Sequence, residues 1–419
     1  MLKCGEWHDR TVASRNDPGG ADACLAQDAH GGLAPRLARW LSPVLLASAI
    51  WAIAALPIWL FALLAGLELP SAFDPLTWHR HEMLFGFVGA AVAGFLLTAI
   101  PNWTGRLPIA GWPLATLALL WVAGRLAVLW SGAVGPMLAA AIDVALWLVL
   151  AFVGAREILA AKNRNLPLVA MVLLFGLANA LDHAGANGAI GDRDLGMRAG
   201  TALVILMISV IGGRIIPSFT RNWLAKRGHT AGLPGQPGRF DLAVILVTAA
   251  ALIGWIVMPS AAPVGALLAL AALLQLARLG RWRGWRTTSD RLVLILHVGY
   301  FWVPIGLGLL GASLLALPVP RSAAIHALTA GAMATMILAV MTRATLGHTA
   351  RPLAATALTH VAYLLVTLGA VIRVLSSLGA VGYRAGMEAA GTLWVGAFVL
   401  FLVVYGPMLV GARTDNAPG

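Results

Sequence analysis

The sequence predicts an all-α membrane protein with about twelve transmembrane helices, because few of its residues are charged and long apolar segments recur along it. Sixty percent of the 419 residues are hydrophobic, 11% are charged, and the mean hydropathy is +0.84. A soluble domain carries roughly 25% charged residues, so this chain could not cover a water-facing surface. Apolar segments of about 20 residues recur along it, each long enough to cross a hydrocarbon core. No alternation of period two is present, so helices are the expected spanning elements.

The chain divides into a polar start, a long apolar region and a short polar end. Residues 1–35 are rich in Gly and Asp and contain both cysteines, and we expect a disordered cytoplasmic tail there. Residues 36–412 form the predicted transmembrane domain, and residues 413–419 a short cytoplasmic tail. The expected spans are 44–66, 78–101, 109–130, 134–160, 166–186, 197–219, 240–258, 262–281, 290–317, 322–346, 354–377 and 386–412.

A short internal echo predicts a repeat within the transmembrane domain. Ile100–Thr104 (IPNWT) ends the second expected span, and Ile216–Thr220 (IPSFT) ends the sixth. Met341–Arg343 ends the tenth in a weaker form of the same pattern. Three units of four helices would make the second, sixth and tenth spans equivalent.

The net charge of +12 indicates the orientation of the protein in the membrane. When loops are assigned alternately to two sides, 22 of the 29 basic residues fall on one side and six on the other. Basic residues accumulate in cytoplasmic loops, so both termini are expected in the cytoplasm. The basic balance therefore does not indicate a nucleic-acid partner; the expected partner is the lipid bilayer.

Ionisable residues inside lipid are costly, so each is a candidate for function. The predicted topology sorts them into two layers, one near each face of the membrane. The outer layer holds His79, His81, Glu82, His183 and His326, and the inner layer His297, His348 and His360. Two histidine layers in one bundle predict two metal or haem centres.

His81 and His326 are the strongest candidates for haem ligands. Small residues follow each of them at helical spacing, Gly89 and Ala93 after His81, leaving room for a flat macrocycle between two imidazoles. Arg373 is placed to pair with haem propionates. His79 and His81 point about 200° apart on a helix, so at most one of them faces a given centre.

Arg125 and Asp143 lie in the outer halves of adjacent expected spans. We expect these two opposite charges to neutralise one another.

Several long segments resemble the signature of the NnrS family. They are Trp78–Phe87 (WHRHEMLFGF), Gly94–Arg106, Gly212–Asn222, His326–Met333 and Thr342–Thr349, and the resemblance covers residues 36–412. It implies a bacterial inner-membrane protein that contains haem, expected to be b-type, and copper. It also implies a link to nitric oxide metabolism and defence against nitrosative stress. Two roles stay open, turnover of nitric oxide and protection of metal centres from it, and so does the electron donor, quinol or another.

A more distant likeness joins the chain to haem–copper oxidases and nitric oxide reductases. Those proteins also have twelve core helices in three arcs, with haem-ligating histidines on the second and tenth helices, as His81 and His326 would be here. Their sixth helix carries a copper ligand, whereas the sixth span here contains no histidine. Copper would then bind at the inner pair His297 and His360, or at the outer pair His79 and His183, with Glu82 nearby. The alternative function is a permease for a small molecule or metal ion.

Overall fold

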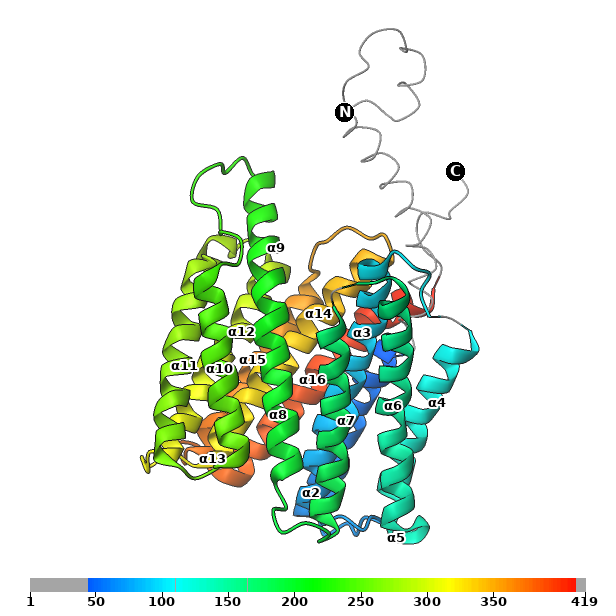
Figure 1. The fold of residues 1–419 in the computed structure, drawn as a ribbon. Helices are drawn as coiled ribbons and strands as arrows, with labels where there is room; N and C mark the ends of the chain where they lie inside the picture. The colour runs from blue at the N-terminus through cyan, green and yellow to red at the C-terminus, as the bar shows by residue number, and fades with distance from the viewer. Residues whose placement is uncertain (1–43, 110, 164, 412–419) are drawn as a thin grey trace, which may run out of the picture.

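The computed structural model describes residues 44–109, 111–163 and 165–411, and these residues are helical with no strand among them (Figure 1). The predicted tails, 1–35 and 413–419, lie outside the described residues. Within the described chain, 12 helices are long and apolar enough to cross a membrane, which confirms the predicted fold class.

Nine of the spans are single helices, and three are built from successive segments. The single helices are Val44–Leu64, α4 (Trp112–Leu129), α6 (Pro136–Ala160), α7 (Leu166–Ala186), α10 (Arg239–Val257), α11 (Ala262–Arg281), α12 (Arg291–Leu314), α15 (Ala357–Ser377) and α16 (Tyr383–Val410). The composite spans are α2 (Pro75–His81), η2 (Glu82–Val88) and α3 (Gly89–Thr104); α8 (Leu195–Met207), η3 (Ile208–Gly212) and α9 (Gly213–Lys226); and α13 (Arg321–His326), η5 (Ala327–Met333) and α14 (Ala334–His348). Short turns α5 (Ser131–Val134) and η4 (Gly284–Thr287) complete the described elements.

The composite spans are the second, sixth and tenth, and each contains a π-helical segment: η2, η3 or η5. A π turn interrupts the regular i to i−4 ladder, and other groups can then bond to its carbonyls. Trp121 Nε1 donates to Gly86 O in η2 at 3.1 Å, and Arg278 donates to Ser209 O in η3 at 2.8 Å. The same irregularity at every fourth span supports the predicted equivalence of these three helices.

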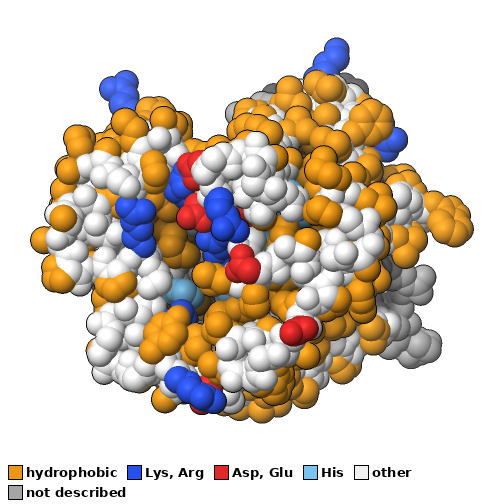
Figure 2. All heavy atoms as spheres, turned by 90° about the horizontal axis from the view of Figure 1, so that it is seen from below, with side chains coloured by type: hydrophobic (Ala, Val, Ile, Leu, Met, Phe, Trp, Pro, Cys, Tyr) orange, Lys and Arg blue, Asp and Glu red, His pale blue; other side chains and the backbone are white. Residues whose placement is uncertain are grey.

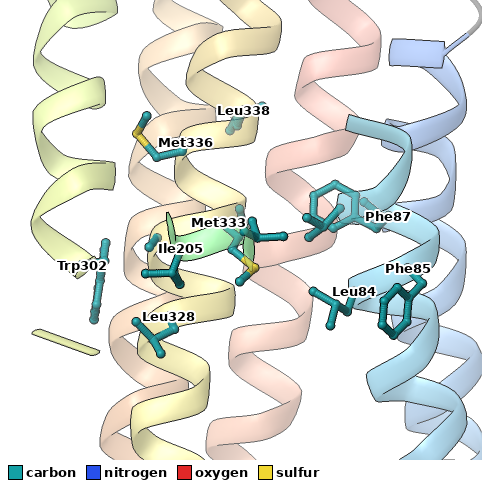
Figure 3. Packing of buried hydrophobic residues seen from close by; sticks show 14 of the residues in the cluster. Leu84, Phe85, Phe87, Ile205, Trp302, Leu328, Met333, Met336 and Leu338 are labelled. Atoms are coloured by element: carbon teal, nitrogen blue, oxygen red, sulfur yellow. The ribbon is translucent and has the colours of Figure 1, made fainter. Parts of the chain in front are cut away.

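The three composite spans meet in the middle of the bundle, where α8 contacts both η2 and η5. Their side chains form a dense apolar core that includes Leu84 and Phe85 from η2, Ile205 from α8, and Leu328 and Met333 from η5 (Figure 3). Because these segments are fixed by neighbours on all sides, polar groups carried on them are held in a rigid frame.

The remaining spans surround this core and expose large apolar side chains outward, such as Leu119, Phe152 and Leu273. Such a surface is stable in lipid, where exposed leucine and phenylalanine side chains carry no hydration penalty. The protein is therefore a multi-pass membrane protein. Helices α2, α5 and α13 lie at one end of the bundle and α9 at the other; we name these the α2 end and the α9 end (Figure 1).

The α2 end begins with a well-defined helix start. Asp74 caps α2: its Oδ1 accepts hydrogen bonds from the backbone N–H groups of Leu76 and Thr77, both at 3.1 Å, and Pro75 occupies the first turn. The second span therefore begins at Pro75, three residues before the predicted start at 78, and His79 and His81 are placed in its first turns.

Helices α7 and α8 approach closely at Gly196. A Cβ atom on this glycine would lie 2.5 Å from Ala178 O and would overlap the backbone nitrogen of Asp182. Backbone atoms cannot move aside as a side chain can, so overpacking here should cost about 1–3 kcal/mol. We expect Gly196→Ala to lower the apparent Tm of the detergent-purified protein by several degrees.

The control is Gly406→Ala in α16, where an added Cβ meets no atom within 4 Å. Alanine favours a helix over glycine by roughly 0.5–1 kcal/mol, so this variant should keep or raise the Tm. Equal Tm values for the two variants would contradict the close packing of α7 against α8.

Candidate metal centre

A group of buried polar side chains lies between four spans near the α2 end, and we name it the polar cluster. It is built from residues on α2, η2, α4, α6 and α7, all of them 3% exposed or less. Its members are His81, Glu82, Arg125, Asp143, Asn179, Asp182 and His183. Ionisable groups buried this deeply are stable only when they are paired or bound to an ion.

His81 is held through both ring nitrogens. Its Nδ1 is 2.8 Å from Asp182 Oδ2, and its Nε2 is 3.0 Å from Asp143 Oδ2. A neutral imidazole has a single N–H, so both contacts are hydrogen bonds donated by His81 only when the ring is protonated. In a neutral ring whose Nδ1–H donates a hydrogen bond to Asp182, the Nε2 lone pair is free to bind a metal ion. This is the usual arrangement of a metal-bound histidine.

Asp143 Oδ2 is the point where several donors converge. Besides His81, it lies 3.1 Å from His183 Nε2 and accepts a hydrogen bond from Asn179 Nδ2 at 2.8 Å. Ligand atoms of His81, Asp143 and His183 all lie within 4.8 Å of one another. Two imidazoles and one carboxylate at this spacing form a donor set that suits Zn, Cu, Fe or Ni.

Arg125 bridges the carboxylates of the cluster. Its guanidinium bonds to Glu82 Oε2 at 2.7 Å and, through its other terminal nitrogen, to Asp143 Oδ1. The predicted neutralisation of Arg125 by Asp143 is confirmed. Trp51 Nε1 also donates to Glu82 Oε2, at 2.7 Å, and this contact is possible because Gly86 has no side chain: a Cβ there would lie 2.7 Å from both atoms.

The polar cluster lacks one partner. Three carboxylates face one guanidinium and two imidazoles. Several buried polar atoms also have no hydrogen-bond partner: Glu82 Oε1, Asn179 Oδ1, Asp182 Oδ1, His183 Nδ1 and Arg125 Nε. Three of the five are oxygen acceptors. Unsatisfied oxygen acceptors beside carboxylates and imidazoles fit a bound divalent cation with water.

A second buried network offers an internal comparison. Gln275 donates to Ser209 Oγ and Thr248 Oγ1 and accepts from Tyr300 Oη at 2.6 Å, while Arg278 pairs with Asp241 at 2.9 Å. None of these side chains leaves a buried polar atom without a partner. This network is complete by itself and locks α10, α11 and α12 to η3, whereas the polar cluster is not complete.

The loop between α7 and α8 closes over the α2 end through ion pairs. Arg80 pairs with Asp194 at 2.7 Å, and Arg193 lies 3.8 Å from Asp74. Arg198 holds Asp192 with both terminal nitrogens, and its hydrogen bonds lower the pKa of the Asp192 carboxyl. The first two contacts tie the loop to α2 and its N-cap residue, and the contact of Arg198 ties it to α8.

His79 faces away from the polar cluster, as its two-residue spacing from His81 predicts. Its ring stacks on Trp59 with centroids 3.8 Å apart, and its Nδ1 is buried without a partner. His326 donates from Nδ1 to Ser322 O at 2.6 Å. His79, His326 and Arg373 lie within electrostatic range of one another. Figure 2 shows a hollow at this end of the bundle with a histidine and basic side chains in it.

The structure groups the outer histidines differently from the sequence-based pairs. His183 lies beside His81 instead of His79, with ring centroids 4.7 Å apart, and His326 lies within electrostatic range of His79 instead of beside His81. That His81 is an axial haem ligand stays a prediction; binding a haem iron would require one of its two hydrogen bonds to break. Towards the α9 end, His297 Nε2 lies 2.8 Å from Thr220 Oγ1, and His360 is exposed on the first turn of α15.

Sequence reasoning did not name Asn179, Asp182 or Trp51 as candidates for this site. Asn179 could have been found, because Asn179, Asp182 and His183 occupy positions i, i+3 and i+4 of one helix and so share a face. Trp51 gives no such signal: it stands in an apolar run, and only the approach of its helix to Gly86 reveals its role.

The fold and the polar cluster together define a polytopic membrane protein with a buried candidate metal centre. The family model described as NnrS protein matches residues 42–413, nearly the whole chain, and the chain therefore belongs to the NnrS family. Comparison with curated proteins finds no match.

Arg125 should be essential for the stability of the polar cluster. Arg125→Met leaves Glu82 and Asp143 buried without their counter-charge, which typically costs about 3–5 kcal/mol. We expect a large loss of folded protein and of Tm in detergent, with partial recovery in the double variant Arg125→Met, Glu82→Gln.

The matched control is Arg384→Met. Arg384 pairs with Glu388 at 3.0 Å, but the two side chains are 72% and 50% exposed. An exposed pair is worth roughly 0–1 kcal/mol, so this variant should behave like the unmodified protein. A mild phenotype for Arg125→Met would show that the cluster does not depend on this charge.

Proposed function

We propose that the protein is a haem- and copper-binding membrane protein that acts in nitric oxide metabolism or in protection against nitrosative stress. Membership of the NnrS family supports this proposal, and the observation that carries it is the incomplete polar cluster. A buried donor set with unsatisfied oxygen acceptors is costly as a purely structural device and is explained by a bound cation.

We assign copper to the polar cluster. His81 Nε2, His183 Nε2 and Asp143 Oδ2 would hold the ion, since their atoms already lie within 4.8 Å of one another. Asp182 would fix the tautomer of His81 through its Nδ1, and Arg125 and Asn179 would hold the Asp143 carboxylate in place. Asp182, Arg125 and Asn179 would thus orient the three ligands so that their lone pairs point to one place, in a site closed to bulk water.

We assign haem to the neighbourhood of His79, His326 and Arg373. The Nδ1 of His326 is occupied by Ser322 O, which directs the Nε2 lone pair outward as in a metal-ligating histidine. His79 contributes a second imidazole, and Arg373 a positive charge suited to a propionate. A haem held by these residues would supply a redox-active iron.

The charge distribution supports the orientation in the membrane. We propose that the α2 end faces the outside of a bacterial inner membrane and the α9 end the cytoplasm, because basic residues are concentrated in the loops on the α9 side. The candidate sites would then lie near the outer face. A quinol or another donor would supply electrons.

Copper content is the first test. We expect the purified protein to retain about one copper per chain through gel filtration, and His183→Ala and Asp143→Asn to lose most of it, because losing a ligand weakens metal affinity by at least about 10–100-fold. Metal content is measured by plasma mass spectrometry. His229→Ala is the control, since His229 is exposed in the loop after α9.

Two outcomes would count against the copper assignment. One is full copper retention in both cluster variants. The other is loss of copper in His297→Ala or His360→Ala with the cluster variants unaffected, which would move the ion to the inner histidines. A protein without copper or haem that transports a solute in liposomes would favour the permease alternative.

Haem content is an independent test. We expect a Soret band in the purified protein and its loss, or a large decrease, in His326→Ala and His79→Ala, with copper retained. The reduced-minus-oxidised spectrum and a pyridine haemochrome assay measure this. If instead His81→Ala abolishes the Soret band and His79→Ala leaves it intact, then His81 is the second axial ligand.

A further inference from the structure

An apolar cavity of ≈ 200 Å³ lies between the helix Val44–Leu64, α3, α4 and α6. Alanine, valine and leucine side chains form nearly all of its lining, together with Trp121. An apolar cavity of this size stays dry and accepts small apolar molecules such as xenon or benzene. It is therefore a binding space for an uncharged guest and not a water-filled channel.

The cavity lies one helical turn beyond the polar cluster. Each of three spans contributes one residue to the cluster or to its contact with Trp51. Three or four positions away, the same span contributes a residue that lines the cavity. The pairs are Trp51 and Ala47, Arg125 and Trp121, and Asp143 and Leu146. On the second span, Gly86 stands between Glu82 and the lining residue Ala90, four positions from each. Residues three or four positions apart lie on the same face of a helix, about one turn of 5.4 Å from each other. The cavity therefore lies next to the cluster in the direction of the helix axes.

A thin wall separates the two spaces. Trp121 forms part of the cavity lining, donates its Nε1 proton to Gly86 O at 3.1 Å, and packs edge-on against Trp51 with centroids 5.9 Å apart. Trp51 in turn donates to Glu82. Two indoles, Trp121 and Trp51, and one side-chain-free residue, Gly86, therefore stand between the cavity and the polar cluster.

The cavity is partly open towards the lipid-facing surface. Val122, which lines the cavity, is 43% exposed on α4. A guest that dissolves in hydrocarbon can enter there without crossing any polar group, whereas an ion or a polar molecule would have to leave water without a partner.

We propose that this cavity is the entry and holding site for a small uncharged apolar gas of the nitric oxide class, which reaches the polar cluster from the bilayer past Trp121. This inference rests on the proposed function for the identity of the gas. The occupant follows from the apolar lining, from the volume, which suits a small molecule, and from the contact of the cavity wall with the cluster.

Xenon tests the cavity without any dependence on metal or nitric oxide. Crystals of the protein in lipidic mesophase, pressurised with xenon, should show xenon among Ala90, Ala93 and Trp121, and Ala118→Phe should remove it. Absence of xenon there, or a lipid acyl chain filling the cavity, would overturn the proposal.

Nitric oxide binding tests the route. In the metal-loaded protein, stopped-flow absorption should show nitric oxide binding to Ala118→Phe about tenfold more slowly, or about 1.4 kcal/mol of added barrier, with the final spectrum and copper content unchanged. Leu119→Phe is the matched control, because Leu119 is the next residue on α4 and points into lipid at 64% exposure.

The two hypotheses fail in different ways. An unmodified protein without metal, or without a nitric oxide response, contradicts the proposed function, while xenon still reports on the cavity. A normal response in the unmodified protein with an unchanged rate in Ala118→Phe contradicts the route through the cavity.

Discussion

The packing of the second, third and fourth spans depends on the pairing of Arg125 with Asp143 and Glu82 inside the membrane. A charge left alone in hydrocarbon would be prohibitive, so the spans that carry these residues must meet, and in one register. The guanidinium fixes the Asp143 carboxylate, and that carboxylate gathers His81, His183 and Asn179 around one oxygen. The geometry of the candidate metal centre follows from this single constraint.

The π-helical segments give the central spans the shape that this gathering requires. In η2, Glu82 and Gly86 lie on the side that faces Trp51 and Arg125, and Gly86 lets both side chains reach the Glu82 carboxylate. Trp121 donates a hydrogen bond to Gly86 O and at the same time lines the apolar cavity. The irregular backbone, the charged cluster and the cavity are thus parts of one arrangement, consistent with the frequent occurrence of π segments at functional sites.

The two buried networks of the bundle show how a structural role differs from a binding role. Around Gln275, Arg278 and Tyr300, every buried donor and acceptor is satisfied by protein, and this region needs no guest. In the polar cluster, three buried oxygen acceptors and two nitrogen atoms remain without a partner. Both networks are costly to build in lipid, but only the second is completed by adding a cation, and that difference supports a metal centre near the α2 end.

Much of the architecture could be predicted from the sequence: the spans, the equivalence of the second, sixth and tenth helices, and several of the buried ionisable residues. Hydrophobic length and the cost of charge in lipid act locally along the chain, so both are visible before the fold is known. The pairing of Arg125 with Asp143 was predicted for the same reason. Which histidines lie together depends on the fold. His81 lies beside His183 and two carboxylates, and His79 lies within electrostatic range of His326, because the azimuth and depth of each helix depend on close contacts such as Gly196 against Asp182, which no residue spacing encodes.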